Sequence, residues 1–166
     1  MYARSSVKTL VLFATMLITG MLCNSVKGQT NNPPQNPHSF TGTWIVQAQL
    51  TNCAGTTVQS FSKLLAINGG GTALETSNAV PPSARTTAFG VWEHVGHRNF
   101  VYALRFFTFS PTGTFATTVN AKWDVWLGDD GNSYTGTGAI QIVSPGGTVI
   151  ANLCGTETGT RMVIPE

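Results

Sequence analysis

Hydrophobic and polar residues alternate along much of the chain after residue 40. The clearest case is the run 115–127, in which the odd positions are mostly apolar and the even positions mostly polar. A period of two is the pattern of a β-strand with one buried face. Trp126 breaks the pattern, so we expect its ring on the outer face or at the strand end. Residues 43–50 alternate in the same way, with Trp44 on the apolar side.

Turn residues divide the rest of this region into further short runs of β-branched and aromatic residues. Together they predict eight strands, over 43–50, 58–67, 72–76, 86–95, 100–109, 115–127, 133–143 and 148–154. No segment repeats apolar residues at helical spacing behind a capping signal, so no helix is predicted. Eight short antiparallel strands are typical of a closed barrel or a β-sandwich.

Two cysteines bear on that choice. Cys53 follows the first predicted strand, and Cys154 lies in the last. In an oxidising compartment such a pair is expected to form a disulfide. A closed up-and-down barrel places its first and last strands side by side, where this disulfide would join the seam. The pair therefore favours an all-β, eight-stranded antiparallel up-and-down barrel, with the β-sandwich as the alternative.

The first 28 residues have the pattern of a signal peptide. Arg4 and Lys8 precede an uncharged, mostly apolar run over 9–22, which is too short for a membrane-spanning helix. We expect cleavage near Gly28 and a secreted or periplasmic protein. A lipid anchor on Cys23 is the alternative, although Leu22 stands where a lipobox has a small residue.

Residues 29–39 are polar and contain three prolines, which predicts a disordered lead-in to a barrel domain over 40–166. Beyond residue 28 the chain has six Lys and Arg against seven Asp and Glu. This balance leaves no basic stripe, so we expect no nucleic-acid partner. No second apolar run is long enough to span a membrane. The oligomeric state is not predicted by these patterns.

A short motif connects the chain to a known group of barrels. Gly42-Thr43-Trp44, at the head of the first strand, resembles the G-x-W signature of lipocalins and the wider calycin group. Arg161, just beyond the last predicted strand, resembles the arginine that packs over that tryptophan and closes the barrel end. The span from Gly42 to Arg161 is also similar to small exported bacterial β-barrel proteins of uncharacterised function. The resemblance implies a lipocalin-like barrel without the C-terminal helix, since only five residues follow Arg161, and it implies no particular ligand.

Aromatic residues are dense in three successive predicted strands, between 86 and 127. They are either a packed core or the lining of an apolar cavity, and eight-stranded barrels of this kind hold one small ligand. The residues predicted to line a ligand site are Trp92, Tyr102, Arg105, Phe107 and Trp123. On an inner face Arg105 would be a buried cation that needs a partner, and on an outer face it would be an ordinary surface residue.

Motifs for catalysis and cofactors are missing from the sequence. His94 and His97 have an H-x-x-H spacing, but positions three apart on a strand face opposite sides, so no metal site is predicted. The chain has no nucleophile elbow, P-loop or dinucleotide fingerprint, so we predict no catalytic residues and no cofactor. We therefore expect an exported protein that holds a small hydrophobic molecule in a barrel lumen. The alternatives are a packed structural or interaction module, and a cavity-shaped isomerase or cyclase of the allene oxide cyclase barrel type.

Overall fold

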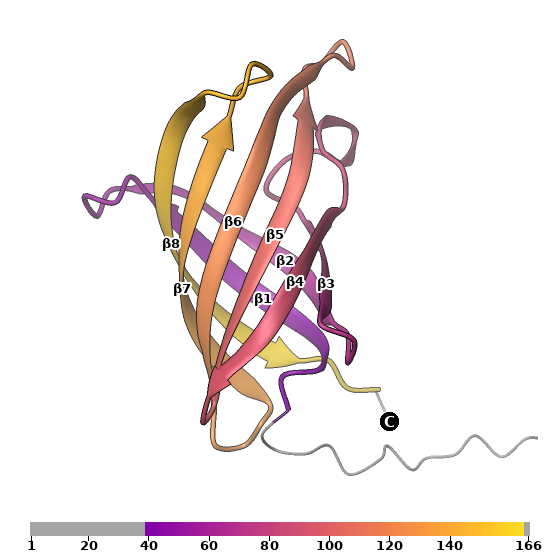
Figure 1. Cartoon of the computed structure of the whole chain (residues 1–166), viewed down its shortest axis with the longest axis vertical. Coiled ribbons are helices and arrows are strands. Elements are labelled where there is room, and N and C mark those ends of the chain that lie inside the picture. Colours follow the sequence, from indigo (N-terminus) through magenta and orange to yellow (C-terminus); the bar gives the residue numbers. More distant parts are fainter. Residues whose placement is uncertain (1–38, 165–166) are drawn as a thin grey trace, which may run out of the picture. The chain divides into compact units, whose positions relative to one another are not determined.

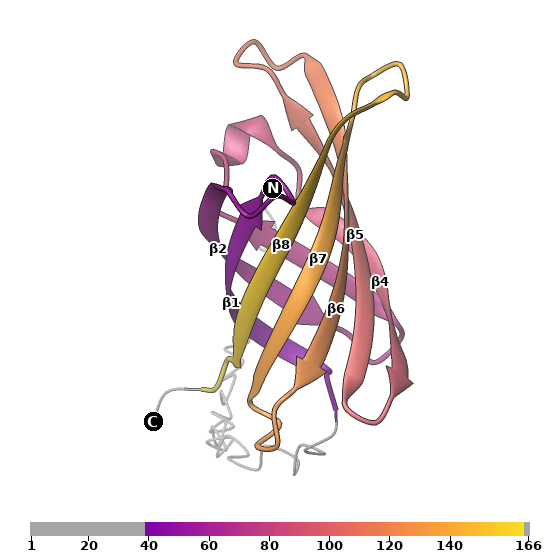
Figure 2. The same ribbon diagram turned by 90° about the vertical axis from the view of Figure 1, so that its left-hand side faces the viewer.

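The structure, a computed structural model, describes residues 39–164. The predicted signal peptide and almost all of the predicted lead-in lie outside the described residues. Eight antiparallel strands close into one barrel, in which each strand pairs with the next and β8 pairs with β1 (Figures 1 and 2). The strands are β1 (Gly42–Thr51), β2 (Thr57–Ile67), β3 (Thr72–Ser77), β4 (Ala88–Gly96), β5 (Asn99–Phe109), β6 (Phe115–Leu127), β7 (Ser133–Val143) and β8 (Val149–Arg161). The predicted up-and-down barrel is therefore confirmed.

Two boundaries differ from the prediction by more than one residue. β8 continues seven residues past Cys154, so Arg161 is the last residue of the strand rather than a residue beyond it. The extension is paired with both neighbours, since Thr160 lies opposite Ser133 of β7 and opposite Ile45 of β1. β4 begins at Ala88 rather than at residue 86, and the chain before it contains a short 3-10 helix, η1 (Pro82–Ala84), that the sequence did not predict.

Side chains alternate between the inner and outer faces of the barrel, as the period of two predicts. In β1 the inner positions are Trp44, Val46, Ala48 and Leu50, and the first three of these are buried. In β6 the odd positions from 119 to 127 are all buried, whereas Trp126 is 48% exposed on the outer face. The interpretation of these two strands is confirmed except at Phe115, which is exposed and packs against Phe107.

The two ends of the barrel are filled differently. At one end, which we call the closed end, the β2–β3, β4–β5 and β6–β7 turns surround a cluster of rings; the β4–β5 hairpin is at the bottom of Figure 1. Phe40 lies at its centre, with ring centroids 5.1 Å from Phe100 and 5.3 Å from Tyr134. The other end, which we call the open end, is formed by the β1–β2, β3–β4, β5–β6 and β7–β8 connections.

The disulfide predicted between Cys53 and Cys154 is present. Cys154 pairs with Thr51 in the last register pair between β1 and β8, and Cys53 lies in the turn just beyond Thr51. The Cα atoms are 4.8 Å apart, and the bridge spans 101 residues of sequence. It therefore joins the first and last strands at the open end of the seam.

Candidate functional site

The closed end is sealed around Arg161. Its guanidinium carbon lies 4.2 Å from the ring centroid of Trp44, within the range of a cation–π contact. The same guanidinium donates to the carbonyl oxygens of Ser39, Thr41 and Gly131 at 2.6–3.0 Å. These bonds attach the chain before β1 and the β6–β7 turn to the end of β8.

The G-x-W motif has a steric explanation at this end. Gly42 has φ = +136°, a conformation that favours glycine. A Cβ atom at this position would also lie 2.5 Å from Nη1 of Arg161. Gly42 therefore leaves the space in which the arginine covers Trp44.

The open half of the lumen holds a cavity of about 210 Å³. Its wall is mostly apolar, and every strand except β4 contributes to it, as does the segment between β3 and β4. The apolar members include Leu50, Phe61, Leu104, Phe106, Val119, Trp123, Ile140, Ile142 and Leu153. The polar members are Gln59, Lys63, Glu75, Ser77, Arg85, Thr108 and Thr117. The site is thus an apolar chamber with charged groups gathered on the side of β2 and β3.

Trp123 forms the boundary between the hollow and the filled halves of the lumen. It lines the cavity, whereas Tyr102, stacked on it with ring centroids 6.4 Å apart, does not. The indole reaches across β7 and β8 because Gly138 and Gly155 leave room for it. A Cβ atom on either glycine would lie 2.6–2.7 Å from the Trp123 ring. The aromatic stack is the floor of the cavity.

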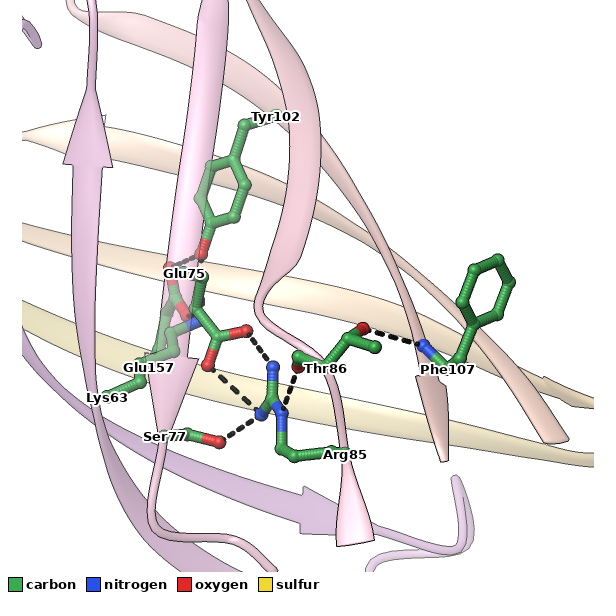
Figure 3. A network of polar contacts seen from close by, with 8 residues as sticks. All are labelled: Lys63, Glu75, Ser77, Arg85, Thr86, Tyr102, Phe107 and Glu157. Carbon is green, nitrogen blue, oxygen red and sulfur yellow. Dashed lines mark hydrogen bonds and ion pairs between the residues drawn. The ribbon is translucent and has the colours of Figure 1, made fainter. Parts of the chain in front are cut away.

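A buried ionic cluster stands beside this floor (Figure 3). Nζ of Lys63 lies 2.6 Å from Oε2 of Glu157, and the side chains are only 3% and 0% exposed. Lys63 also donates to the hydroxyl of Tyr102 at 2.9 Å, and that hydroxyl donates to Oε1 of Glu157 at 2.6 Å. Nζ lies 4.3 Å from the Trp123 ring centroid as well. The lysine is held by an anion, a hydroxyl and an aromatic face at once.

A second ion pair lies closer to the open end. Arg85, in the segment after η1, forms a two-pronged pair with Glu75 of β3, in which Nη2 and Oε2 are 2.8 Å apart (Figure 3). Its remaining contacts are a bond to Ser77, a bond to the carbonyl of Thr86, and the Phe106 ring at 4.0 Å. The guanidinium is therefore largely occupied. Because each cation of the lumen wall is matched by one carboxylate, the cavity presents no net charge.

Burial raises the pKa of the Tyr102 hydroxyl well above its ordinary value, and the neighbouring Glu157 carboxylate raises it further. The pKa of Tyr134 is raised for the same two reasons. Both phenols therefore remain protonated at neutral pH, and Tyr102 acts as a donor toward Glu157. Such a hydroxyl donates a hydrogen bond and does not serve as a base.

The five residues predicted to line a ligand site lie in different places in the structure. Trp123 lines the cavity, and Tyr102 lies in the lumen directly beneath it. Trp92 also points inward but belongs to the closed end, with its ring centroid 6.3 Å from that of Phe40. Arg105 and Phe107 do not line the lumen. They lie on the outer face of β5, because the opposite face, which includes Tyr102, turns inward.

Four charged residues of the lumen were not among the predicted site residues: Lys63, Glu75, Arg85 and Glu157. Three of them carry a signal in the sequence. Each stands at an inner position of a strand, as Lys63 does two residues before Leu65, and a charge at such a position is unusual. Arg85 carries no such signal, because it lies outside any strand and reaches the lumen through the β3–β4 connection.

The two histidines of the β4–β5 hairpin contact each other. Nε2 of His94 donates to the carbonyl oxygen of His97 at 2.8 Å, and the His94 ring stacks on Phe100. Within residues 39–164 no group of three His, Cys, Asp or Glu side chains could hold a metal ion. In the same part of the chain, no helix has the length and apolar character needed to cross a bilayer.

The wall between β2 and the segment after β3 is thin. Lys63, Ser77, Ala79 and Val80 line both the lumen cavity and a groove on the outer surface. Their segment is attached to β2 by the bond between Gln59 and the carbonyl of Ala79, and by a reciprocal pair between Asn78 and Ser62. On this side, a single layer of residues separates the lumen cavity from the outer groove.

Comparison with known proteins identifies no family. No family model and no curated protein matches the sequence. The S-type phycobiliprotein lyase CPES from Guillardia theta aligns with a TM-score of 0.39 and 11% identity, over 76% of this chain and 90% of that chain. Rv2717c from M. tuberculosis aligns with a TM-score of 0.40 and 13% identity, over 77% of this chain and 94% of that one. Likenesses at this level assign neither a family nor a ligand to the chain.

Proposed function

We propose that this protein is an exported binding protein that holds a small, mainly apolar molecule in the open half of its barrel. The observation that supports the proposal is the asymmetric filling of the lumen, which is packed with rings at the closed end and hollow beyond Trp123. A packed interaction module would fill both halves. Because the cavity of about 210 Å³ is smaller than the roughly 300–1,000 Å³ of drug-sized sites, the ligand is a small molecule.

The charge balance of the cavity wall restricts the class of ligand further. Both cations that line the cavity are already paired with carboxylates at 2.6–2.8 Å. A charged ligand would bring an unmatched charge into the lumen, and burying such a charge is costly. The proposed ligand is therefore uncharged, with an apolar body against the wall and a polar atom toward Lys63.

The test uses two substitutions at adjacent positions of β6. Thr117 lines the cavity, whereas Thr118 points away from it. Thr117→Phe is expected to weaken the binding of 3-phenylpropanol at least about tenfold by occupying the space of the ligand, while Thr118→Phe leaves it unchanged. Isothermal titration calorimetry measures both variants, and a panel of small uncharged alcohols and arenes extends the search.

Native mass spectrometry of the protein purified from its host provides the second readout. Extra mass that disappears on denaturation would identify a bound molecule directly. If the wild-type protein binds no member of the panel and carries no extra mass, the packed interaction module is the better account. Equal binding by both phenylalanine variants would place the ligand outside the lumen.

A further inference from the structure

We propose that Lys63 is a covalent attachment site, at which the lumen holds a small apolar aldehyde or ketone as an iminium. The proposal rests on the binding function proposed above and names the chemical class of the ligand. It begins from the position of Lys63, which carries a primary amine and lines a mostly apolar cavity.

Lys63 is chemically distinct from the other cation of the lumen. Arg85 is permanently protonated and shared between Glu75 and Ser77, so it does not act as a nucleophile. Only two lysines lie within residues 39–164, and the other, Lys122, is exposed on the outer face of β6. A carbonyl compound in the cavity therefore meets one amine.

The surroundings of Nζ contain a proton acceptor in the right place. Oε2 of Glu157 lies 2.6 Å away, yet it accepts no hydrogen bond of ordinary geometry from any residue of the described chain. This carboxylate oxygen is buried, has no competing donor among the described residues and lies within reach of an ammonium proton. The Tyr102 hydroxyl, 2.9 Å from Nζ, fixes the direction of the side chain, and the Trp123 ring covers one side of it.

The reaction balances without any further reagent. The ammonium of Lys63 transfers a proton to Glu157, and the nitrogen lone pair then forms a bond to the carbonyl carbon. The carbonyl π electrons move to the oxygen, which takes up a proton that the nitrogen releases. The protonated Glu157 then donates to this hydroxyl, which leaves as water while the nitrogen forms the C=N bond. The sum is an ammonium and a carbonyl compound giving an iminium and one water.

Formation of the iminium leaves the charge of the site unchanged. An iminium carries the same positive charge as the ammonium, so it retains Glu157 as counter-ion and Trp123 as aromatic neighbour. The side chain of Lys63 is only 3% exposed, so the C=N bond is shielded from bulk water, which slows its hydrolysis. An uncharged aldehyde or ketone also satisfies the charge balance argued for the lumen.

The experiment traps the iminium in the full-length wild-type protein. 3-Phenylpropanal is added with sodium cyanoborohydride, which reduces an iminium to a stable secondary amine, and labelled lysines are quantified by peptide mapping. Labelling of Lys63 is expected to saturate with aldehyde concentration and to fall at least about tenfold when 3-phenylpropanol competes for the lumen. Labelling of Lys122 is expected to rise linearly with aldehyde concentration and to be unaffected by 3-phenylpropanol. Lys122 is therefore the internal control.

Two variants extend the test. Lys63→Arg keeps the positive charge beside Glu157 but has no primary amine, and it should lose the saturable label. Lys122→Arg should keep it. If Lys63→Arg does not fold, peptide mapping of the labelled wild-type protein still tests whether Lys63 forms the iminium.

The two proposals can fail separately. Linear labelling of Lys63 that the alcohol does not reduce would overturn covalent attachment. If 3-phenylpropanol still binds in calorimetry, the binding function survives that result. If neither the aldehyde nor the alcohol binds, both proposals are wrong.

Discussion

Inner glycines of β7 and β8 make room for the large rings of the lumen. Gly138 and Gly155 accommodate Trp123, and Gly159 contacts the ring of Tyr134 so closely that a Cβ atom there would overlap it. Tyr134 is only 2% exposed, so its ring has little space into which to move. The small volume of glycine, rather than its backbone freedom, is what these positions require, because none of them has a positive φ.

Gly159→Ala is expected to destabilise the protein by about 1–3 kcal/mol, the usual cost of overpacking a filled core. Gly70→Ala is the matched control, because a Cβ atom in that turn would meet nothing within 4 Å. Urea denaturation followed by tryptophan fluorescence measures the free energy of unfolding of both variants. Equal stability of the two would show that the Tyr134 ring adjusts without cost.

Among the strands, β8 was the one predicted least well, and the reason is visible in its inner face. Beyond Cys154 its inner positions are Gly155, Glu157, Gly159 and Arg161. Glycines and buried charges erase the alternation of apolar and polar residues on which strand prediction depends. The same positions are required by the lumen, since the rings of Trp123 and Tyr134 and the ion pair with Lys63 occupy this space.

The disulfide joins the seam between β1 and β8, and we expect its removal to lower the free energy of unfolding of the whole barrel. Closing a loop of about 100 residues stabilises a protein by up to about 4.7 kcal/mol through the entropy of the unfolded chain, and the bridge spans 101 residues. The double variant Cys53→Ser/Cys154→Ser is therefore expected to lose about 2–4.7 kcal/mol in urea denaturation. Reduced wild-type protein is the control and should match the variant. A loss well below about 1 kcal/mol would mean that the strand ladder alone determines the stability of the seam.

For the molecule as a whole, the burial of two tyrosines makes the free energy of unfolding depend on pH in the alkaline range. Tyr102 and Tyr134 have pKa values raised above that of an exposed tyrosine, about 10. Their contribution to stability is complete below pH 10. Above it, the unfolded chain releases these protons while the folded chain retains them, so the free energy of unfolding falls as pH rises toward the raised values.

Tyrosinate absorbance and circular dichroism test this coupling together. The chain has three tyrosines, and Tyr2 lies outside the described residues. At most one tyrosine is expected to ionise near pH 10, and the other two should ionise only as the circular dichroism of the barrel is lost. Ionisation of all three near pH 10 with the barrel intact would contradict the burial of the phenols.

The sequence alone determined the number and order of the strands, the inner face of β1 and β6, and the pairing of Cys53 with Cys154. These follow from local features, namely the period of two, the turn residues and the position of the cysteines at the two ends of the domain. They favoured a closed barrel over a β-sandwich, and the pairing of β1 with β8 in the structure decided between the two.

Only the tertiary structure decided what lies inside at β5 and which half of the lumen is hollow. Both faces of β5 carry aromatic residues, so periodicity does not distinguish the face of Tyr102 from that of Arg105 and Phe107. The pairing of Lys63 with Glu157 and of Glu75 with Arg85 depends on register across strands distant in sequence. The cavity depends on how far the Trp123 ring reaches over glycines of two other strands, and such packing is set by neighbours in space rather than in sequence.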